Sequence, residues 1–302
     1  MAANPITRDL SGGGCGGPMH RAALAAYIGP SVAMLGMMLI SPVIYALWFS
    51  LHAIDYGTPA GFIGLANFAM MLTDTSLPPM IARTAVFTGA SVVLGVTAAL
   101  ALACWIDRLR GRLAFVAQLF AILPWIISAV VATLLFRWVF VHDLGLGFAA
   151  VRGLGGQPAQ PLNTPSGAMA LLILVSAWKR VGYAVIVLLA GLKSIPGELK
   201  EAARIDGASA WQTFTRVTLP LMRGPLVLVT IVLTLSNLNT VETPLVLTGG
   251  GPAGATRVLP VEIYERAFVN FDLGGATTLA LAAFALNLVL VLGYVRLARL
   301  HV

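Results

Sequence analysis

The sequence is poor in charged residues. Asp, Glu, Lys and Arg make up 10% of its 302 residues, whereas about a quarter of the residues in soluble domains are charged. The two cysteines, Cys15 and Cys104, are too few for a disulfide scaffold, and we expect both to be free thiols. None of the four histidines has a metal-binding spacing such as H-E-x-x-H. A soluble globular enzyme, a disulfide-rich domain and a metalloenzyme are therefore poor fits.

Apolar residues, in contrast, make up 58% of the chain and gather in six runs. Each run is long enough to cross a bilayer, which takes about 20 residues. The first is too long for the apolar part of a signal peptide, which has roughly 7 to 15 residues, so we expect a retained span. The sequence predicts an all-α polytopic membrane protein, with a flexible tail over 1–21 and one transmembrane domain over 22–302. The predicted transmembrane helices lie at about 22–51, 82–106, 113–141, 167–192, 219–247 and 273–297.

The positions of Lys and Arg predict the orientation of these spans. With both termini in the cytoplasm, most of the 19 basic residues fall on the cytoplasmic side, as the positive-inside rule requires. Only Arg83, Arg152, Arg257 and Arg266 then fall outside. Because cytoplasmic loops account for the basic balance, the net charge of +7 requires no nucleic-acid partner.

The longest cytoplasmic segment, 193–220, has the pattern of two short helices. Ser194 is a candidate N-cap for a helix whose first turn contains Pro196 and Glu198 and which runs to about Ile205. Asp206 and Gly207 then predict a turn, and Ser209 can cap a second helix. By composition alone, an amphipathic helix lying on membrane lipid explains this segment equally well.

Its residues also resemble a family signature. Glu201-Ala202-Ala203, Asp206-Gly207-Ala208 and Leu219-Pro220, with Pro225 beyond, resemble the cytoplasmic motif of permease subunits of binding-protein-dependent ABC importers. Thr248-Gly249-Gly250-Gly251-Pro252 and Phe271-Asp272-Leu273-Gly274 resemble the carbohydrate-uptake branch, of the maltose or glycerol-3-phosphate type. The resemblance covers most of the chain from the second span onward.

This resemblance implies a role for the cytoplasmic helix pair as coupling helices. Five residues would form the interface with a cytoplasmic ABC ATPase dimer, namely Glu201, Ala202, Ala203, Asp206 and Gly207. The chain has no P-loop motif of its own, so it is not expected to be an enzyme or to bind a cofactor, and ATP and Mg²⁺ would bind to the partner ATPase. The other implied partners are a second homologous permease subunit and an extracytoplasmic solute-binding protein. The implied location is the cytoplasmic membrane of a bacterium or archaeon.

Polar residues within the predicted spans mark a possible pathway for the cargo. Charges inside a membrane are costly, so Arg137, Lys179, Arg180 and Glu242 need partners or water. An ion pair between Glu242 and Lys179 or Arg180 is one solution. A sugar needs hydrogen-bonding groups and an aromatic face, which predicts a substrate pathway of Trp178, Lys179, Tyr183, Asn237, Asn239, Glu242 and Asn287. Hydrogen bonding between spans is the alternative explanation for the neutral polar residues.

The predicted function is therefore that of the translocation subunit of an ATP-driven importer for a sugar or related polyol. The sequence leaves open whether the cargo is neutral or a phosphorylated polyol, for which the basic residues in the spans would be counter-charges. A self-contained, ion-coupled secondary transporter with ion sites at Glu242 and Asp206 is the alternative function. The cytoplasmic position of Asp206 argues against that alternative. A structural membrane anchor is a third, simpler hypothesis.

Overall fold

The computed structural model describes residues 18–55, 58–141, 145–155 and 160–299. Within these ranges the fold is helical apart from one hairpin, which confirms the predicted fold class. The predicted tail lies almost entirely outside the described residues, as does Cys15, whereas Cys104 is a free thiol. The elements of the first half are α1 (Pro18–Ser50), β1 (His52–Asp55), β2 (Thr58–Phe62), α2 (Ala66–Thr73), α3 (Leu77–Asp107), α4 (Gly111–Ile126), α5 (Ala129–Phe140) and α6 (Leu146–Gly153).

The second half begins with a 3₁₀ turn and contains two π-helical turns. Its elements are η1 (Pro161–Asn163), α7 (Pro165–Ser194), α8 (Gly197–Ile205), α9 (Ala210–Thr213), η2 (Phe214–Thr218), α10 (Leu219–Leu221), α11 (Arg223–Leu238), α12 (Glu242–Thr248), α13 (Leu259–Tyr264), η3 (Glu265–Val269) and α14 (Leu273–Arg299). The π-helical turns are η2 and η3.

Four helices are long and apolar enough to cross a membrane unbroken, in α1, α3, α7 and α14. Two bent pairs bring the number of candidate spans in the described chain to as many as six, in agreement with the predicted six. The pair α4 and α5 is bent by 94°, and the segment Ala210–Leu221 meets α11 at 67°. The chain is therefore a multi-pass membrane protein.

Two predicted spans are not continuous helices. The third is interrupted at Ile127 and Ser128, whose backbones are extended, just after Pro124 has removed one N–H from the last turn of α4. The fifth bends at Met222, where α10 meets α11, and is interrupted between Leu238 and Glu242. Pro244 has no N–H to donate to the carbonyl of Thr240, so a helix cannot pass through this position undisturbed. Both breaks fall in regions that the hydropathy pattern alone assigned to unbroken spans.

The core is built around α7, whose apolar window is 56% buried. At one end of α7, Leu188 and Leu192 pack with Ala103 of α3 and Leu233 of α11. Toward the other end, Leu172 and Val175 pack with Phe87 of α3 and with residues of α12 and α13. α7 therefore holds together both interrupted spans and α3.

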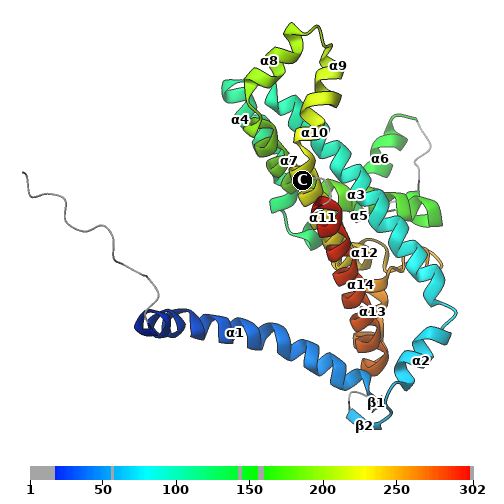
Figure 1. Cartoon of the computed structure of the whole chain (residues 1–302). Coiled ribbons are helices and arrows are strands. Elements are labelled where there is room, and N and C mark those ends of the chain that lie inside the picture. Colours follow the sequence, from blue (N-terminus) through cyan, green and yellow to red (C-terminus); the bar gives the residue numbers. More distant parts are fainter. Residues whose placement is uncertain (1–17, 56–57, 142–144, 156–159, 300–302) are drawn as a thin grey trace, which may run out of the picture.

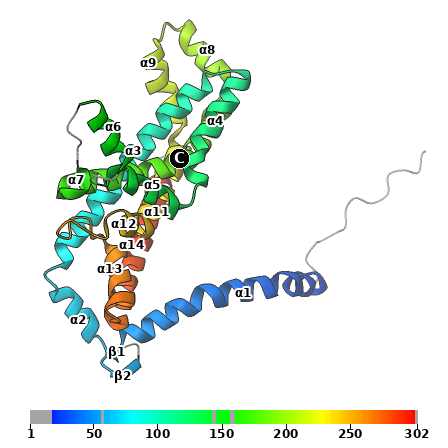
Figure 2. The same cartoon turned by 180° about the vertical axis from the view of Figure 1, so that it is seen from behind.

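The two ends of the molecule are formed by different types of element (Figures 1 and 2). α8 and α9 form the tip at one end, and the antiparallel hairpin of β1 and β2 lies with α2 at the other. The buried Asn67 of α2 secures the hairpin end, since its Nδ2 donates to the carbonyls of Ser50 (2.9 Å) and His52 (3.2 Å). α1 leaves the body beside the hairpin and contacts α14, and none of its apolar window is buried.

Candidate coupling loop and translocation pocket

The first helix of the loop over residues 193–220 forms as predicted but has a different cap. α8 runs to Ile205, and Glu198 lies in its first turn, where the positive end of the helix stabilises a negative charge. The N-cap is Pro196 rather than Ser194. The prediction for Ser194 was wrong because α7 extends to this residue, and the Ser194 hydroxyl donates to the carbonyl of Gly191 at 2.8 Å.

The turn after α8 requires glycine. Gly207 has φ +80°, in the left-handed region that residues with a Cβ rarely adopt. Its N–H donates to the carbonyl of Arg204 (3.0 Å), and the N–H of Ala208 donates to that of Ala203 (2.9 Å). These bonds satisfy carbonyls at the end of α8 and direct the chain sharply into α9.

The second helix begins with a complete capping box. The Ser209 hydroxyl accepts from the N–H of Gln212 at 3.2 Å, and the Gln212 side chain accepts from the N–H of Ser209 at 2.8 Å. The predicted cap at Ser209 is therefore confirmed. The η2 turn then continues from α9 toward α11, so the loop enters the fifth span through helical segments rather than through an irregular linker.

The loop exposes the five predicted interface residues to different degrees. Glu201, Ala202, Asp206 and Gly207 are exposed, and Ala203 is half-buried. Ile205, beside them, is 86% exposed. Leu199 and Trp211 of the same loop are also exposed, at 44% and 72%, and exposed apolar side chains mark an interaction site where they form a contiguous patch.

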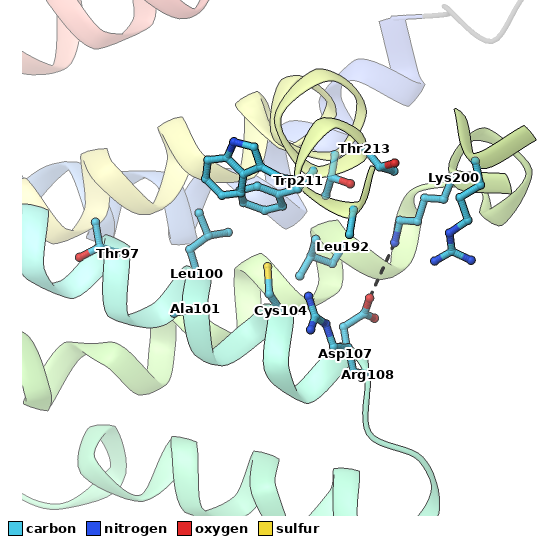
Figure 3. Close-up of a pocket in the computed structure, with 14 residues that line it drawn as sticks. Thr97, Leu100, Ala101, Cys104, Asp107, Arg108, Leu192, Lys200, Trp211 and Thr213 are labelled. Carbon is cyan, nitrogen blue, oxygen red and sulfur yellow. Dashed lines mark ion pairs between the residues drawn. The ribbon is translucent and has the colours of Figure 1, made fainter. Parts of the chain in front are cut away.

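A cavity of about 620 Å³ separates this loop from the C-terminal end of α3 (Figure 3). Leu100, Ala101 and Cys104 line it from α3, and Trp211 and Phe214 line it from the loop. Across it, Lys200 Nζ of α8 lies 3.7 Å from Asp107 Oδ2 at the end of α3. The loop is therefore connected to α3 by an ion pair as well as to α7 and α11 by the chain.

A second pocket, of about 360 Å³, lies between the two helix breaks. It brings together three residues of the predicted pathway, Lys179, Asn239 and Glu242, with six other residues. The complete lining is Trp125, Ala129, Lys179, Arg180, Ser236, Asn239, Thr240, Glu242 and Thr243. Asn287 of α14 reaches this group indirectly, since its Nδ2 donates to Asn239 Oδ1 at 3.1 Å.

The other predicted pathway residues do not line this pocket. The Trp178 ring packs edge-on against Phe136, with centroids 5.0 Å apart, whereas Tyr183 packs near Trp125 at 5.9 Å. These two aromatic residues therefore do not form one shared face for a sugar ring. Asn237 is 1% exposed, and its Nδ2 donates to the carbonyl of Leu233 within α11.

The anticipated ion pair of Glu242 with Lys179 or Arg180 is not formed among the described residues. Lys179 Nζ donates instead to the carbonyl of Trp125 at 3.0 Å. Arg180 donates to the carbonyls of Ser176 and Ser236, each at 3.1 Å, and to the Ser236 hydroxyl at 2.9 Å. Glu242 accepts from the Thr240 hydroxyl at 3.2 Å.

A charged cluster at the hairpin end was not predicted. Arg266 donates to Asp74 at 2.6 Å and to Glu262 at 2.8 Å, while Arg257 pairs with Glu262 and Glu265. Hydrogen bonds from the Ser76 hydroxyl and N–H, together with Arg266, lower the pKa of Asp74 from its usual 3.8 to about 2. The contact of Arg266 with Glu262 has a sequence signal, the i,i+4 spacing of the two residues. The contact with Asp74 has none, because Asp74 lies 192 positions from Arg266.

Comparison with known proteins agrees with this architecture. Residues 91–300 match the family described as binding-protein-dependent transport system inner membrane component. The sulfoquinovosyl glycerol transport system permease protein SmoG of Agrobacterium fabrum is 31% identical, over 90% of this chain and 89% of that protein. The trehalose/maltose transport system permease protein MalF of Thermococcus litoralis is 30% identical, over 89% and 91%.

Two further matches extend the comparison. The sn-glycerol-3-phosphate transport system permease protein UgpA of Yersinia pseudotuberculosis is 33% identical, over 82% of this chain and 84% of that protein. Among solved structures, a chain of a bacterial alginate ABC transporter in complex with an alginate pentasaccharide-bound periplasmic protein has a TM-score of 0.78. It is 24% identical and covers 93% of each chain, which shows a shared fold.

Proposed function

Since the chain belongs to the family of binding-protein-dependent transport system inner membrane components, we propose that it moves a sugar or related polyol inward through the cytoplasmic membrane while a separate subunit hydrolyses ATP. The observation that carries this proposal is the exposed pair of helices α8 and α9, joined at Gly207. A capped helix pair at the end of the molecule is suited to receive a movement from a partner protein and transmit it to the spans.

The ATPase contact would involve Glu201, Ala202, Ala203, Asp206 and Gly207. Glu201 offers a carboxylate to a basic residue of the ATPase, and Ala202 is small enough for close approach. The neighbouring Ile205 adds apolar surface that is removed from water on docking. The ion pair of Lys200 with Asp107 supports transmission toward α3 as well as along the chain.

The complete transporter would contain further subunits. A second permease of the same family would complete the pathway, and two ATPase subunits would bind ATP and Mg²⁺, because the chain contains no P-loop motif. A solute-binding protein would deliver cargo to the hairpin end, and both termini would lie in the cytoplasm. The family description, and the periplasmic protein with which the alginate transporter forms a complex, support the binding-protein partner.

The cargo would pass the pocket between the two helix breaks. Asn239, Thr243 and Glu242 offer amide, hydroxyl and carboxylate groups, which are the partners that hydroxyl-rich molecules need. The named cargoes of the relatives, sulfoquinovosyl glycerol, trehalose or maltose and sn-glycerol-3-phosphate, support a carbohydrate or polyol. Family membership disfavours an ion-coupled secondary transporter, and Asp206 lies in the exposed loop rather than in a span.

The test is ATP hydrolysis and uptake by the chain co-assembled with its ATPase and second permease in liposomes. We expect loaded binding protein to stimulate both activities, and Glu201→Lys to abolish the stimulation without lowering the amount of this chain in the membrane. Arg112→Glu, a charge reversal at an exposed residue at the start of α4, is the matched control and should retain stimulation. Uptake by the chain alone, without an ATPase, would contradict the proposal.

A further inference from the structure

The three basic residues that lie within predicted spans share an unexpected type of partner. None of them forms an ion pair with a carboxylate in the described part of the chain. Each donates instead to a backbone carbonyl of another helix: Lys179 to Trp125 at 3.0 Å, Arg180 to Ser236 at 3.1 Å, and Arg137 to Val246 at 2.9 Å. These partners are 54, 56 and 109 positions away in the sequence.

All three carbonyls lie in the last turns of their own helices. Trp125 lies in the last turn of α4, Ser236 in the last turn of α11, and Val246 in the last turn of α12. The last four carbonyls of a helix have no intrahelical donor, and the helix end carries about half a negative charge. In each case the basic side chain supplies the donor that the end of the helix lacks, and so acts as a helix cap.

We propose that Lys179 and Arg180 are positioning residues that fix the ends of α4 and α11 against α7, rather than groups that bind the cargo. Adjacent on α7, they reach both interrupted helices and thereby hold two walls of the 360 Å³ pocket. Two negative helix ends and the nearby Glu242 carboxylate offset their charges. The pair therefore selects neither for nor against an anionic cargo.

The position of these contacts gives them a role in coupling, and this step rests on the proposed function. α7 and α11 are the helices that precede and follow the coupling loop. Arg180 joins them through Ser236, and Lys179 adds α4 to the same unit. A movement that enters through α8 and α9 would therefore reach both walls of the pocket together. Without the caps, the loop could move while the pocket did not respond.

Substitutions of Lys179 can distinguish its role as a helix cap from a role as a cargo-binding cation. Lys179→Met removes both the donor and the charge, Lys179→Gln retains a neutral N–H donor, and Lys179→Arg retains both. Each variant is assembled with the ATPase, the second permease and the binding protein in liposomes. ATP hydrolysis is measured without binding protein and cargo, and uptake is measured with a neutral and an anionic carbohydrate. Ile186→Met, at an exposed position of α7, is the matched control.

For Lys179→Met we expect hydrolysis without cargo to rise, and uptake per ATP hydrolysed to fall, each by about tenfold, the ratio expected for one lost hydrogen bond to a charged group. Lys179→Gln should show a smaller change, while Lys179→Arg and Ile186→Met should match the wild type for both cargoes. If Lys179→Met does not assemble, the comparison of Lys179→Gln with Lys179→Arg still tests the proposal, because only Lys179→Gln should differ from the wild type.

Two results would overturn the proposal. One is equal loss of anionic uptake in Lys179→Gln and Lys179→Met with unchanged hydrolysis in the absence of cargo, which identifies a cargo-binding cation. The other is wild-type behaviour of all variants. If the proposed importer function itself is wrong, the result is different: loaded binding protein would not stimulate ATP hydrolysis by the wild-type complex.

Discussion

Lys200 of α8 and Asp107 of α3 form an ion pair of 3.7 Å that spans the cavity between the α8–α9 loop and α3. Both side chains are about one quarter exposed, at 26% and 28%. Screening by water therefore limits the pair to roughly 0.2 to 1 kcal/mol of stability. In the proposed mechanism, this pair would couple a displacement of α8 to α3.

Reversal of one charge in this pair should impair transport more than stability. In Lys200→Glu two carboxylates face each other across the cavity, so we expect uptake to fall by several fold with little change in thermal stability. The exchanged pair Lys200→Asp with Asp107→Lys restores opposite charges and should recover most of the uptake. Uptake in liposomes is the measurement, and an exchanged pair no better than Lys200→Glu would contradict a role for the contact.

Gly207 should tolerate asparagine better than valine. No atom lies within 4 Å of a Cβ added at this position, so the effect of a substitution is conformational rather than steric. Its φ of +80° is accessible to Asn but strained for a β-branched residue, at a cost of roughly 1 to 3 kcal/mol. We expect Gly207→Val to lose stimulation of ATP hydrolysis and Gly207→Asn to retain it. Equal activities would show that the turn geometry is unimportant.

The capping box of α9 can be tested one bond at a time. Ser209→Ala removes the acceptor for the N–H of Gln212 and should destabilise the loop by about 1 kcal/mol. Gln212→Ala removes only the reciprocal bond to the N–H of Ser209, so we expect a smaller effect. Amide hydrogen exchange over residues 209–218 measures both variants. Protection unchanged in Ser209→Ala would be inconsistent with the observed cap.

The ion cluster at the hairpin end should make stability depend on pH in an acidic window. Because the pKa of Asp74 falls from 3.8 to about 2 on folding, its stabilising contribution is complete above about pH 5. It is lost as the pH falls from there through about 2. We expect Asp74→Asn, which is uncharged, to lower stability at pH 6 and to show less of this acid-dependent loss. Thermal unfolding in detergent between pH 6 and about pH 2 is the measurement, and parallel profiles would refute the assignment.

Local features of the molecule could be predicted from the sequence, and distant contacts could not. The end of α8 at Ile205, the turn at Gly207 and the cap at Ser209 follow from residues within a few positions of one another. The partner of Lys179 is a backbone carbonyl 54 positions away, which becomes available only because α4 ends at Ile126. Hydropathy does not reveal that break, since the residues on both sides of it are apolar.

The pathway residues illustrate the same limit. The predicted pathway included Asn239 and Glu242, and the pocket contains both, together with Ser236, Thr240 and Thr243 of the same segment. The pattern did not show that Asn237 points into the core or that Trp178 and Tyr183 have separate aromatic partners. The directions of these side chains depend on how α4, α5 and α11 pack around α7.

The most direct test of the coupling interface is a cross-link from the coupling loop to the ATPase. Ala202→Cys, in a chain with Cys15→Ser and Cys104→Ser, is labelled with a thiol-anchored photoreactive group in membranes that contain the assembled transporter. Met70→Cys, at an exposed position of α2 near the opposite end of the molecule, is the control. We expect an adduct with the ATPase from position 202 and none from position 70. An ATPase adduct from neither position, or from both equally, would contradict the proposed interface.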